Sequence, residues 1–305
     1  MNRCYKYRLY PTPDQEEYFQ KCFGCARFVY NAVLEKQNEV YQNGGAFMTR
    51  FDANNYCNHV LKEQYLFLKE VDKFVLTNSI WALDVAFRSF FDHRTNYPRF
   101  KSRDRCRKAY TTNYVNNNIE VSENAIKLPK IKWVKAKVHR LAPNHWVLKQ
   151  ATISQDSVGD YYCSIMFDCG DSDLHSALSR ELALGLDYKS DGFFVSSEGE
   201  VCGSPQFFKQ SEQALAKEQK KLARMQKGSS NYEKQRKKVA KRMRHIANQR
   251  KDFSHKKATE LADRWDYIFV EHLDLKEMAS RAGKKTMDNG YGEFLELLQY
   301  KMEER

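Results

Sequence analysis

The sequence predicts a mixed α+β protein built from several modules, and the patterns along its 305 residues support this fold class. Apolar residues recur at helical spacing through segment 11–105, whereas polar and apolar residues alternate through much of 106–180. Segment 181–305 combines short apolar strands with long basic helices. The composition, with 42% hydrophobic and 13% aromatic residues, favours folded structure over disorder. A chain of this length can bury more than one core.

Segment 11–105 is expected to be a helical module. Thr12 can cap its first helix, and Gln15 three residues later completes a capping box. Further helices are expected at 52–68 and 73–92. The last of these carries one apolar stripe at helical spacing, which we interpret as core: Leu76, Ile80, Leu83, Phe87 and Phe90.

Segment 106–180 is expected to form a small antiparallel β-barrel or sandwich, since short alternating runs are separated by residues that favour turns. A further strand is expected at the N-terminus, over residues 3–10. The strands expected inside the barrel segment are 119–121, 125–128, 133–134 and 161–167.

Segment 181–305 begins with an apolar strand and then becomes strongly helical, with a basic helical insert over 206–265. The break between two long basic helices is expected at the Gly-Ser-Ser-Asn run 228–231. The expected elements are strands at 182–186, 192–197 and 201–202, the two basic helices, a further helix, a strand at 267–271 and a last helix at 294–302.

Positive charge is concentrated in one part of the chain. The whole protein has 51 Lys and Arg against 39 Asp and Glu, a net charge of +12, and residues 209–251 alone hold 15 basic against 3 acidic residues. This excess favours a polyanionic partner, with a basic solubilising helix as the alternative. The phosphate contacts that we expect are Lys220, Lys221, Arg224, Lys237, Lys238, Lys241, Arg242 and Arg244.

The eight cysteines are scattered, which favours reduced thiols over a disulfide framework. Cys22 and Cys25 form the only close pair, and a structural zinc site requires four ligands. We therefore expect no zinc; two small residues on one helix explain the pair better than a metal site does. No apolar stretch approaches the roughly 18 residues of a membrane span, so we expect no membrane association and an intracellular protein.

Two carboxylates follow apolar strands. Asp187 closes one predicted strand and Glu271 closes another, with the basic insert between them. A carboxylate at the end of a buried strand is costly unless it is paired or binds a cation. The two residues could form part of a two-metal phosphodiester site, or each could be an ordinary acid at a strand end.

At these residues the chain resembles TnpB, the RNA-guided endonuclease family of insertion sequences, which is related to type V CRISPR effectors. The matching segments occur in one order over nearly the whole chain. They are Tyr7-Arg8-Leu9-Tyr10-Pro11, Phe23 to Asn31, Tyr97-Pro98-Arg99-Phe100-Lys101, Gly185-Leu186-Asp187, Gln249 to Lys256, Val270-Glu271-His272-Leu273 and Asp288-Asn289-Gly290-Tyr291-Gly292.

The resemblance implies a wedge β-barrel made of residues 1–10 and 106–180, a helical recognition domain at 11–105 and a RuvC-like domain of RNase H fold at 181–305. It also implies a guide RNA and a double-stranded DNA target as partners, with the protein recognising a short target-adjacent motif. The residues that match motif contacts are Lys73, Phe74 and Thr77, although a lysine more often binds phosphate and a phenylalanine is as often core. The residues expected to contact guide RNA or heteroduplex, besides those of the basic insert, are Tyr5, Tyr7, Arg8, Arg99 and Lys101.

The chain departs from the family at the acids. Asp187 and Glu271 match two catalytic positions, whereas the third aspartate and the zinc ribbon of TnpB lie beyond the part that matches. Lys189 adds a cation two residues after Asp187, which makes bound Mg²⁺ doubtful. We therefore expect a truncated, nuclease-dead RuvC domain.

The function that follows is RNA-guided DNA binding without cleavage, repressing transcription at a promoter in a bacterial cytoplasm, with the protein associated with the nucleoid when bound. The alternatives are a magnesium-dependent RNA-guided endonuclease, with residual activity or truncated from an active parent, and a decayed transposon relic. The sequence leaves open whether the protein is a monomer or a dimer.

Overall fold

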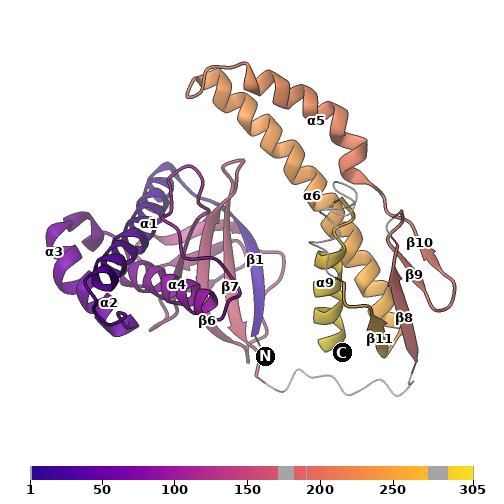
Figure 1. Ribbon diagram of the computed structural model, residues 1–305, viewed down its shortest axis with the longest axis horizontal. Coiled ribbons are helices and arrows are strands. Elements are labelled where there is room, and N and C mark those ends of the chain that lie inside the picture. Colours follow the sequence, from indigo (N-terminus) through magenta and orange to yellow (C-terminus); the bar gives the residue numbers. More distant parts are fainter. Residues whose placement is uncertain (1, 171–181, 190, 274–287, 305) are drawn as a thin grey trace. The chain divides into compact units, whose positions relative to one another are not determined.

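The computed structural model describes residues 2–170, 182–189, 191–273 and 288–304 (Figure 1). The chain divides into two compact units, Met1–Gly170 and Asp171–Arg305, which are described separately. The expected linker at 171–179 lies outside the described residues. None of the described helices combines the length and the apolar character needed to cross a bilayer.

The first unit contains one seven-stranded antiparallel sheet in the order β2-β6-β7-β1-β5-β4-β3. The N-terminal strand lies inside this sheet, between two strands that come more than a hundred residues later. The strands are β1 (Asn2–Tyr10), β2 (Lys108–Asn113), β3 (Glu120–Val121), β4 (Ala125–Leu128), β5 (Lys132–Lys137), β6 (Val147–Gln155) and β7 (Tyr161–Asp168).

The strands expected from alternation are present, and the sequence analysis missed two others, β2 and β6. Strand β6 pairs with both β2 and β7, yet its pairing with β7 shifts register between Leu148 and Gln150. A bulge of this kind inserts one extra residue and inverts the alternation. The pattern of β6 therefore lost its period of two at the place where a strand would have been recognised.

The helices of the first unit follow the sequence closely. Thr12 caps α1 and forms the predicted capping box with Gln15, and Asn43 ends the helix. The region 52–68 is not one helix but a series of short segments that includes a π-helical turn. The helices are α1 (Pro13–Gln42), α2 (Arg50–Tyr56), the π-helix η1 (Cys57–Leu61), α3 (Lys62–Gln64), the 3₁₀-helix η2 (Leu66–Lys69) and α4 (Lys73–Phe91).

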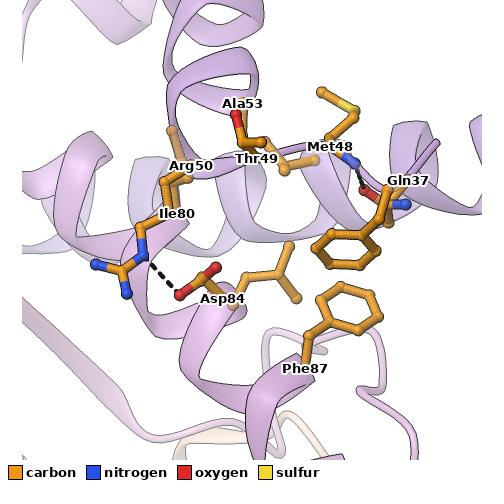
Figure 2. A pocket seen from close by; sticks show the side chains of 11 residues that line it. Gln37, Met48, Thr49, Arg50, Ala53, Ile80, Asp84 and Phe87 are labelled. Carbon is orange, nitrogen blue, oxygen red and sulfur yellow. Dashed lines mark hydrogen bonds and ion pairs between the residues drawn. The ribbon is translucent and has the colours of Figure 1, made fainter. Parts of the chain in front are cut away.

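Polar contacts fix α2 on the two long helices (Figure 2). Arg50 binds Asp84 of α4 with 2.6 Å between Nε and Oδ2, and the buried amide of Gln37 on α1 accepts the backbone N–H of Met48 at 2.9 Å. Only about 20 Å³ remains open between these side chains, which is room for one water molecule. The contact is therefore a packed joint between helices.

The second unit contains a four-stranded sheet in the order β10-β9-β8-β11. Strands β8, β9 and β10 form an antiparallel meander, whereas β11 pairs with β8 in parallel. A parallel neighbour requires a long crossover, and here the crossover includes two helices. The elements are β8 (Ala183–Tyr188), β9 (Phe194–Ser196), β10 (Val201–Cys202), α5 (Phe207–Ala223), α6 (Ser230–Arg264), β11 (Tyr267–Val270) and α9 (Tyr291–Glu303).

The basic insert differs from the prediction in one respect. The second basic helix and the further helix expected after it are a single 35-residue helix, α6 (Figure 1). The break at 228–231 is present, and Ser229 caps α6 by accepting the N–H of Tyr232 at 3.1 Å. The far half of α6 and helix α9 pack on the sheet around Phe193, Phe194 and Phe294. The observed architecture is a mixed α+β fold, as predicted.

Candidate nucleic-acid interface and acidic strand ends

Strand β1 divides its side chains between two faces of the sheet. Tyr5 and Tyr7 are buried, Tyr7 completely, and the Tyr7 hydroxyl donates to the carbonyl of Arg140 at 3.1 Å. Tyr5 packs 5.5 Å from the ring of Trp146. These two tyrosines belong to the core, which corrects the expectation that they contact RNA. Arg8 points to the opposite, accessible face.

Cations and an aromatic ring alternate on that outer face. Lys6 Nζ lies 4.5 Å from the centroid of the Tyr162 ring, and the Arg8 guanidinium carbon lies 5.2 Å from the same centroid. Arg8 also lies 5.5 Å from the Tyr10 ring and pairs with Asp160 at 2.5 Å. The outer face of β1 therefore places Lys6 and Arg8 beside two aromatic rings, of which Tyr10 is 48% exposed.

Strand β5 extends the same face. Tyr10 is opposite Lys135 and Arg8 is opposite Lys137, and both lysines are exposed. Trp133, two residues before Lys135, is 44% exposed. Positive charge interleaved with rings is the surface that single-stranded nucleic acids bind. The alternation of β1 could have revealed this face, because residues of even number lie opposite the buried tyrosines.

The α5–α6 hairpin presents most of the positive charge of the second unit. Leu215 is the one buried residue of α5, so its lysines lie in solvent. Of the expected phosphate contacts, Arg244 is half-buried and Arg242 lies 3.8 Å from Glu218. The exposed ones are Lys220, Lys221, Arg224, Lys237, Lys238, Lys241 and Arg242.

A buried polar contact holds the two arms of this hairpin together. The amide of Gln235 on α6 donates to the backbone carbonyl of Glu218 on α5 at 3.1 Å and to its carboxylate at 2.6 Å. The hydrogen bond from Gln235, with the positive charges of Arg242, Lys221 and Lys238, lowers the pKa of Glu218. The Glu218 carboxylate therefore accepts a hydrogen bond between the two helices of the hairpin, and the exposed lysines remain a surface with net positive charge.

The residues that match motif contacts lie together on the first turns of α4. Lys73 is exposed with its ammonium 4.9 Å from the Phe74 ring, and Phe74 and Thr77 are half-buried. The start of the helix is fixed on the sheet, because the Thr112 hydroxyl donates to the Asp72 carboxylate at 2.6 Å. These three residues are therefore neighbours at the start of α4, and their contact with a DNA motif stays a prediction.

The basic loop before β2 is anchored on α1. The Asn31 amide donates to the carbonyl of Lys101 at 2.9 Å and accepts its N–H at 2.8 Å. The Lys101 ammonium lies 3.6 Å from the centroid of the Tyr30 ring, and burial lowers the pKa of Lys101. Lys101 thus has a structural role in holding the loop, whereas Arg99 is exposed.

Asp187 and Glu271 lie at the same end of the second sheet, where β8 and β11 finish, and we call this end the acidic edge. Leu186 is opposite Val270 in the parallel pair β8–β11, so Asp187 and Glu271 are the next facing residues. Neighbouring strands lie about 4.8 Å apart, so the two acids each directly follow one residue of a pair on adjacent backbones. Both residues are exposed, which corrects the expectation of a costly buried carboxylate.

Lys189 follows Asp187 in the turn between β8 and β9. Its aliphatic carbons lie 3.4 and 3.6 Å from the position that a Cβ on Gly192 would take. The lysine stem is therefore packed along the turn.

Residues 288–291 form hydrogen bonds both with the start of α5 and with the loop between β8 and β9. The Asp288 carboxylate accepts the N–H groups of Phe208 and Lys209 at 3.0 and 3.2 Å, so it caps α5 from a distant part of the chain. Asn289 donates to the carbonyl of Gly192 at 3.0 Å. Gly290 adopts a φ of 64°, which favours glycine. The predicted turn before the last helix is confirmed only at Gly290, because residues 288 and 289 are helical.

Tyr291 completes the acidic edge. Its ring packs 4.8 Å from the ring of Tyr188 and is only 2% exposed. Burial, together with the negative charges of Asp187 and Glu271, raises the pKa of Tyr291 to about 12. The phenol therefore stays neutral beside the two carboxylates.

The acid pair has the chemistry of a magnesium ligand set. Mg²⁺ in proteins is commonly held by one or two carboxylates together with waters and phosphate oxygens. Asp187 and Glu271 are two exposed carboxylates of this chemical type, and an ion held by them would stabilise negative charge on a phosphate. The cysteine pair has a different character, because Cys22 and Cys25 are buried on α1 and burial raises the pKa of the Cys22 thiol to about 12 and that of Cys25 to about 11.

Comparison with known proteins places this arrangement in a family. Residues 1–46 match the helix-turn-helix domain of the IS605 OrfB proteins, although the described part of this segment holds one strand and one long helix. Residues 174–282 match the OrfB family described as "Probable transposase".

Two curated relatives and one solved structure are similar over most of the chain. A proposed RNA-guided DNA endonuclease of Streptomyces pristinaespiralis is 29% identical over 99% of this chain and 75% of its own length. The proposed RNA-guided DNA endonuclease InsQ of Escherichia coli (strain K12) is 27% identical over 92% of this chain and 68% of its own length. Cas12f1, solved with sgRNA and target DNA, shares the fold with a TM-score of 0.60 and 12% identity, covering 96% of this chain and 72% of that chain. The chain is therefore similar to the OrfB proteins of IS605-type elements in both matched segments, and to proposed RNA-guided DNA endonucleases over nearly its whole length.

Proposed function

We propose that this chain binds double-stranded DNA under the direction of a guide RNA, beside a short motif contacted by the protein. The α5–α6 hairpin carries the proposal, because its outward lysines form a polyanion-binding surface in which 15 basic residues stand against 3 acidic ones over residues 209–251. The basic and aromatic face of the first sheet supports it. In guided effectors, base pairing provides sequence specificity and the protein contacts shape and a short flanking motif.

We also propose that a polypeptide of these 305 residues binds target DNA without cutting it. A two-metal site must hold two cations against the attacking and leaving oxygens, and Asp187 with Glu271 supplies ligands for one. Lys189 adds positive charge two residues from Asp187, which opposes the binding of a divalent cation. A stable complex placed on a promoter would exclude polymerase and repress transcription.

The second candidate function is RNA-guided cleavage. One observation favours it: Asp187 on β8 and Glu271 directly after β11 follow the facing pair Leu186 and Val270, and both acids are exposed, so a phosphodiester could approach them. The names of the two curated relatives agree with this candidate.

One experiment separates the two functions. RNA that copurifies with the protein would be sequenced to define the guide, and the complex would be incubated with labelled target duplex and Mg²⁺. We expect retarded DNA with intact strands, and a duplex of scrambled sequence should not be retarded. Cut product that disappears in the Asp187→Ala, Glu271→Ala variant would instead establish the endonuclease. A complex that ignores the guide sequence would contradict both.

A further inference from the structure

An open pocket of about 270 Å³ lies on the first unit, between α1 and the irregular helical segment that follows α2. It is smaller than the roughly 300–1,000 Å³ pockets that hold drug-sized ligands, so it suits one small planar group. Its lining includes Arg27, Phe28, Asn31, Leu61, Gln64 and Tyr65.

Aromatic rings form one wall of the pocket. The Phe28 ring meets the Tyr65 ring edge to face at 4.7 Å, and Phe67 packs behind at 5.4 Å from Phe28. Tyr65 is 39% exposed, and Leu66 beside it is 67% exposed. A fixed ring at the mouth of a pocket, with apolar surface left in water around it, is typical of a binding site.

The backbone of the segment that carries Tyr65 departs from regular α-helix at two places beside the pocket. The π-helix Cys57–Leu61 interrupts the helical segment, and Tyr65 leaves the helix with φ −126° and ψ 86°. Single π-helical turns are rare and occur frequently at functional sites. Leu61 is 2% exposed and closes the floor of the pocket.

Polar groups at the rim remain available for a ligand. Among the described residues, the side chains of Arg27 and Gln64 make no hydrogen bond or ion pair with the protein. Asn31, in the same pocket, differs because its amide donates one hydrogen bond to the backbone of Lys101 and accepts one from it. The rim thus combines the Arg27 guanidinium and the Gln64 amide with the aromatic wall, and the Glu35 carboxylate also lines the pocket.

We propose that this pocket binds one unpaired nucleobase of the guided complex, an inference that rests on the proposed function. The base would stack on the Tyr65 ring, which Phe28 supports edge to face, with the Gln64 amide at its hydrogen-bonding edge and Arg27 on the adjoining phosphate. Unpaired bases are recognised in this way, by stacking on aromatic rings and by amide groups that can both donate and accept. The base belongs either to the guide RNA or to a DNA strand.

Photocrosslinking identifies the source of the base. Guide RNA carrying 4-thiouridine and target DNA carrying 5-iododeoxyuridine would be assembled in separate complexes, irradiated and digested for peptide mapping. We expect one of the two probes to crosslink to the peptide that contains Tyr65. Absence of a crosslink to this pocket from either probe would overturn the inference.

Substitutions provide a second test. Loss of a stacking ring in Tyr65→Ala should weaken binding of the stacked strand roughly 5- to 150-fold, whereas Tyr65→Phe should bind within about twofold of the original chain. Gln64→Ala, at an exposed position, should weaken binding without affecting the fold. Tyr41→Ala is the matched control, because Tyr41 is 79% exposed and lies outside the pocket.

The outcomes separate this inference from the function on which it rests. If the unsubstituted complex fails to retain matched DNA, the proposed function fails and the pocket inference falls with it. If that complex binds normally and the Tyr65→Ala and Gln64→Ala variants bind equally well, the pocket inference alone is wrong.

Discussion

The helical hairpin of the second unit and the outer face of the first sheet both present lysines and arginines, but their surroundings differ. Between residues 209 and 251 the hairpin sequence contains a single tyrosine, phenylalanine or tryptophan, Tyr232. The sheet face instead places Tyr162 between Lys6 and Arg8, with Tyr10 and Trp133 close by in the register. One surface offers charge alone, and the other offers charge with rings.

The two surfaces should therefore differ in which nucleic acids they discriminate. Lysines on long helices bind phosphates, which every nucleic acid carries, and the binding is strongly dependent on salt. Rings bind the faces of unpaired bases, so they separate single strands from duplexes and depend less on salt. We therefore expect the hairpin to set affinity and the sheet face to favour unpaired nucleotides.

The largest expected effect comes from neutralising the hairpin. Changing Lys220, Lys221, Lys237 and Lys238 to Gln should lower the slope of log affinity against log salt by about 3 to 4, since each duplex phosphate contact contributes about 0.9. At about 0.1 M salt this corresponds to a loss on the order of 1,000-fold, with the preferred target unchanged. Filter binding across a salt series measures both quantities.

A matched control has the same change in charge. Lys21, Lys36, Lys149 and Lys256 are solvent-accessible lysines that each pair with an acidic side chain. Their replacement by Gln should leave the slope nearly unchanged. An equal loss in both variants would mean that overall charge, rather than the hairpin, determines binding.

The next effect is expected on the sheet face. Trp133→Ala should weaken binding of single-stranded RNA by about 1–3 kcal/mol, while the salt slope stays constant. Trp133→Phe should retain most of the affinity, because a ring remains. Fluorescence anisotropy with short RNA and with duplex DNA checks the distinction, and a changed slope would show that the two surfaces act alike.

A smaller effect should follow loss of the distant helix cap. Asp288→Ala leaves two N–H groups of α5 without their acceptor and should lower the free energy of unfolding by about 0.5–2 kcal/mol. Asp288→Asn should lose less, since Asn also caps helices. Ser229→Ala removes the local cap of α6 and is the control. If the hairpin is anchored through Asp288, only the Asp288→Ala variant should also weaken RNA binding.

The last effect concerns the acidic edge, which has the opposite charge, and it is confined to alkaline pH. The pKa of Tyr291 is raised from 10.0 to about 12, so the folded protein holds the phenol proton more tightly than the unfolded chain. Its contribution to stability is complete below about pH 10 and is lost as the pH rises through about 12. Urea unfolding between about pH 9 and about pH 11.5 should show this decline, and Tyr291→Phe should make it shallower. An unchanged decline in Tyr291→Phe would assign it to other groups.

Local chemistry could be predicted from the sequence, but pairing between distant segments could not. The Thr12 cap, the stripe of α4 and the break before α6 depend on neighbouring residues, and the structure confirms them, except that Phe90 at the end of the stripe is only half-buried. Strand β6 was missed because its bulge disturbs the alternation. The burial of Tyr5 and Tyr7 depends on which face of β1 packs into the core, and that is decided by residues far along the chain.

The acidic edge shows the same limit. Asp187 and Glu271 were identified as strand ends, yet their facing positions follow from the parallel pairing of β8 with β11. The cap that Asp288 provides for α5 joins residues 80 positions apart, and no local pattern signals it. The resemblance to a family identified the segments that contain these residues, but it did not predict which residues they contact.

Helix α6 has a mechanical consequence. Its 35 residues correspond to a rod of about 50 Å, with lysines near one end and the buried Ala258 and Leu261 near the other. Shortly beyond the end of this rod the chain enters the strand that precedes Glu271. One continuous helix therefore joins the outward lysines of its first half to the core of the second sheet, and the chain passes from it into the strand that pairs with β8.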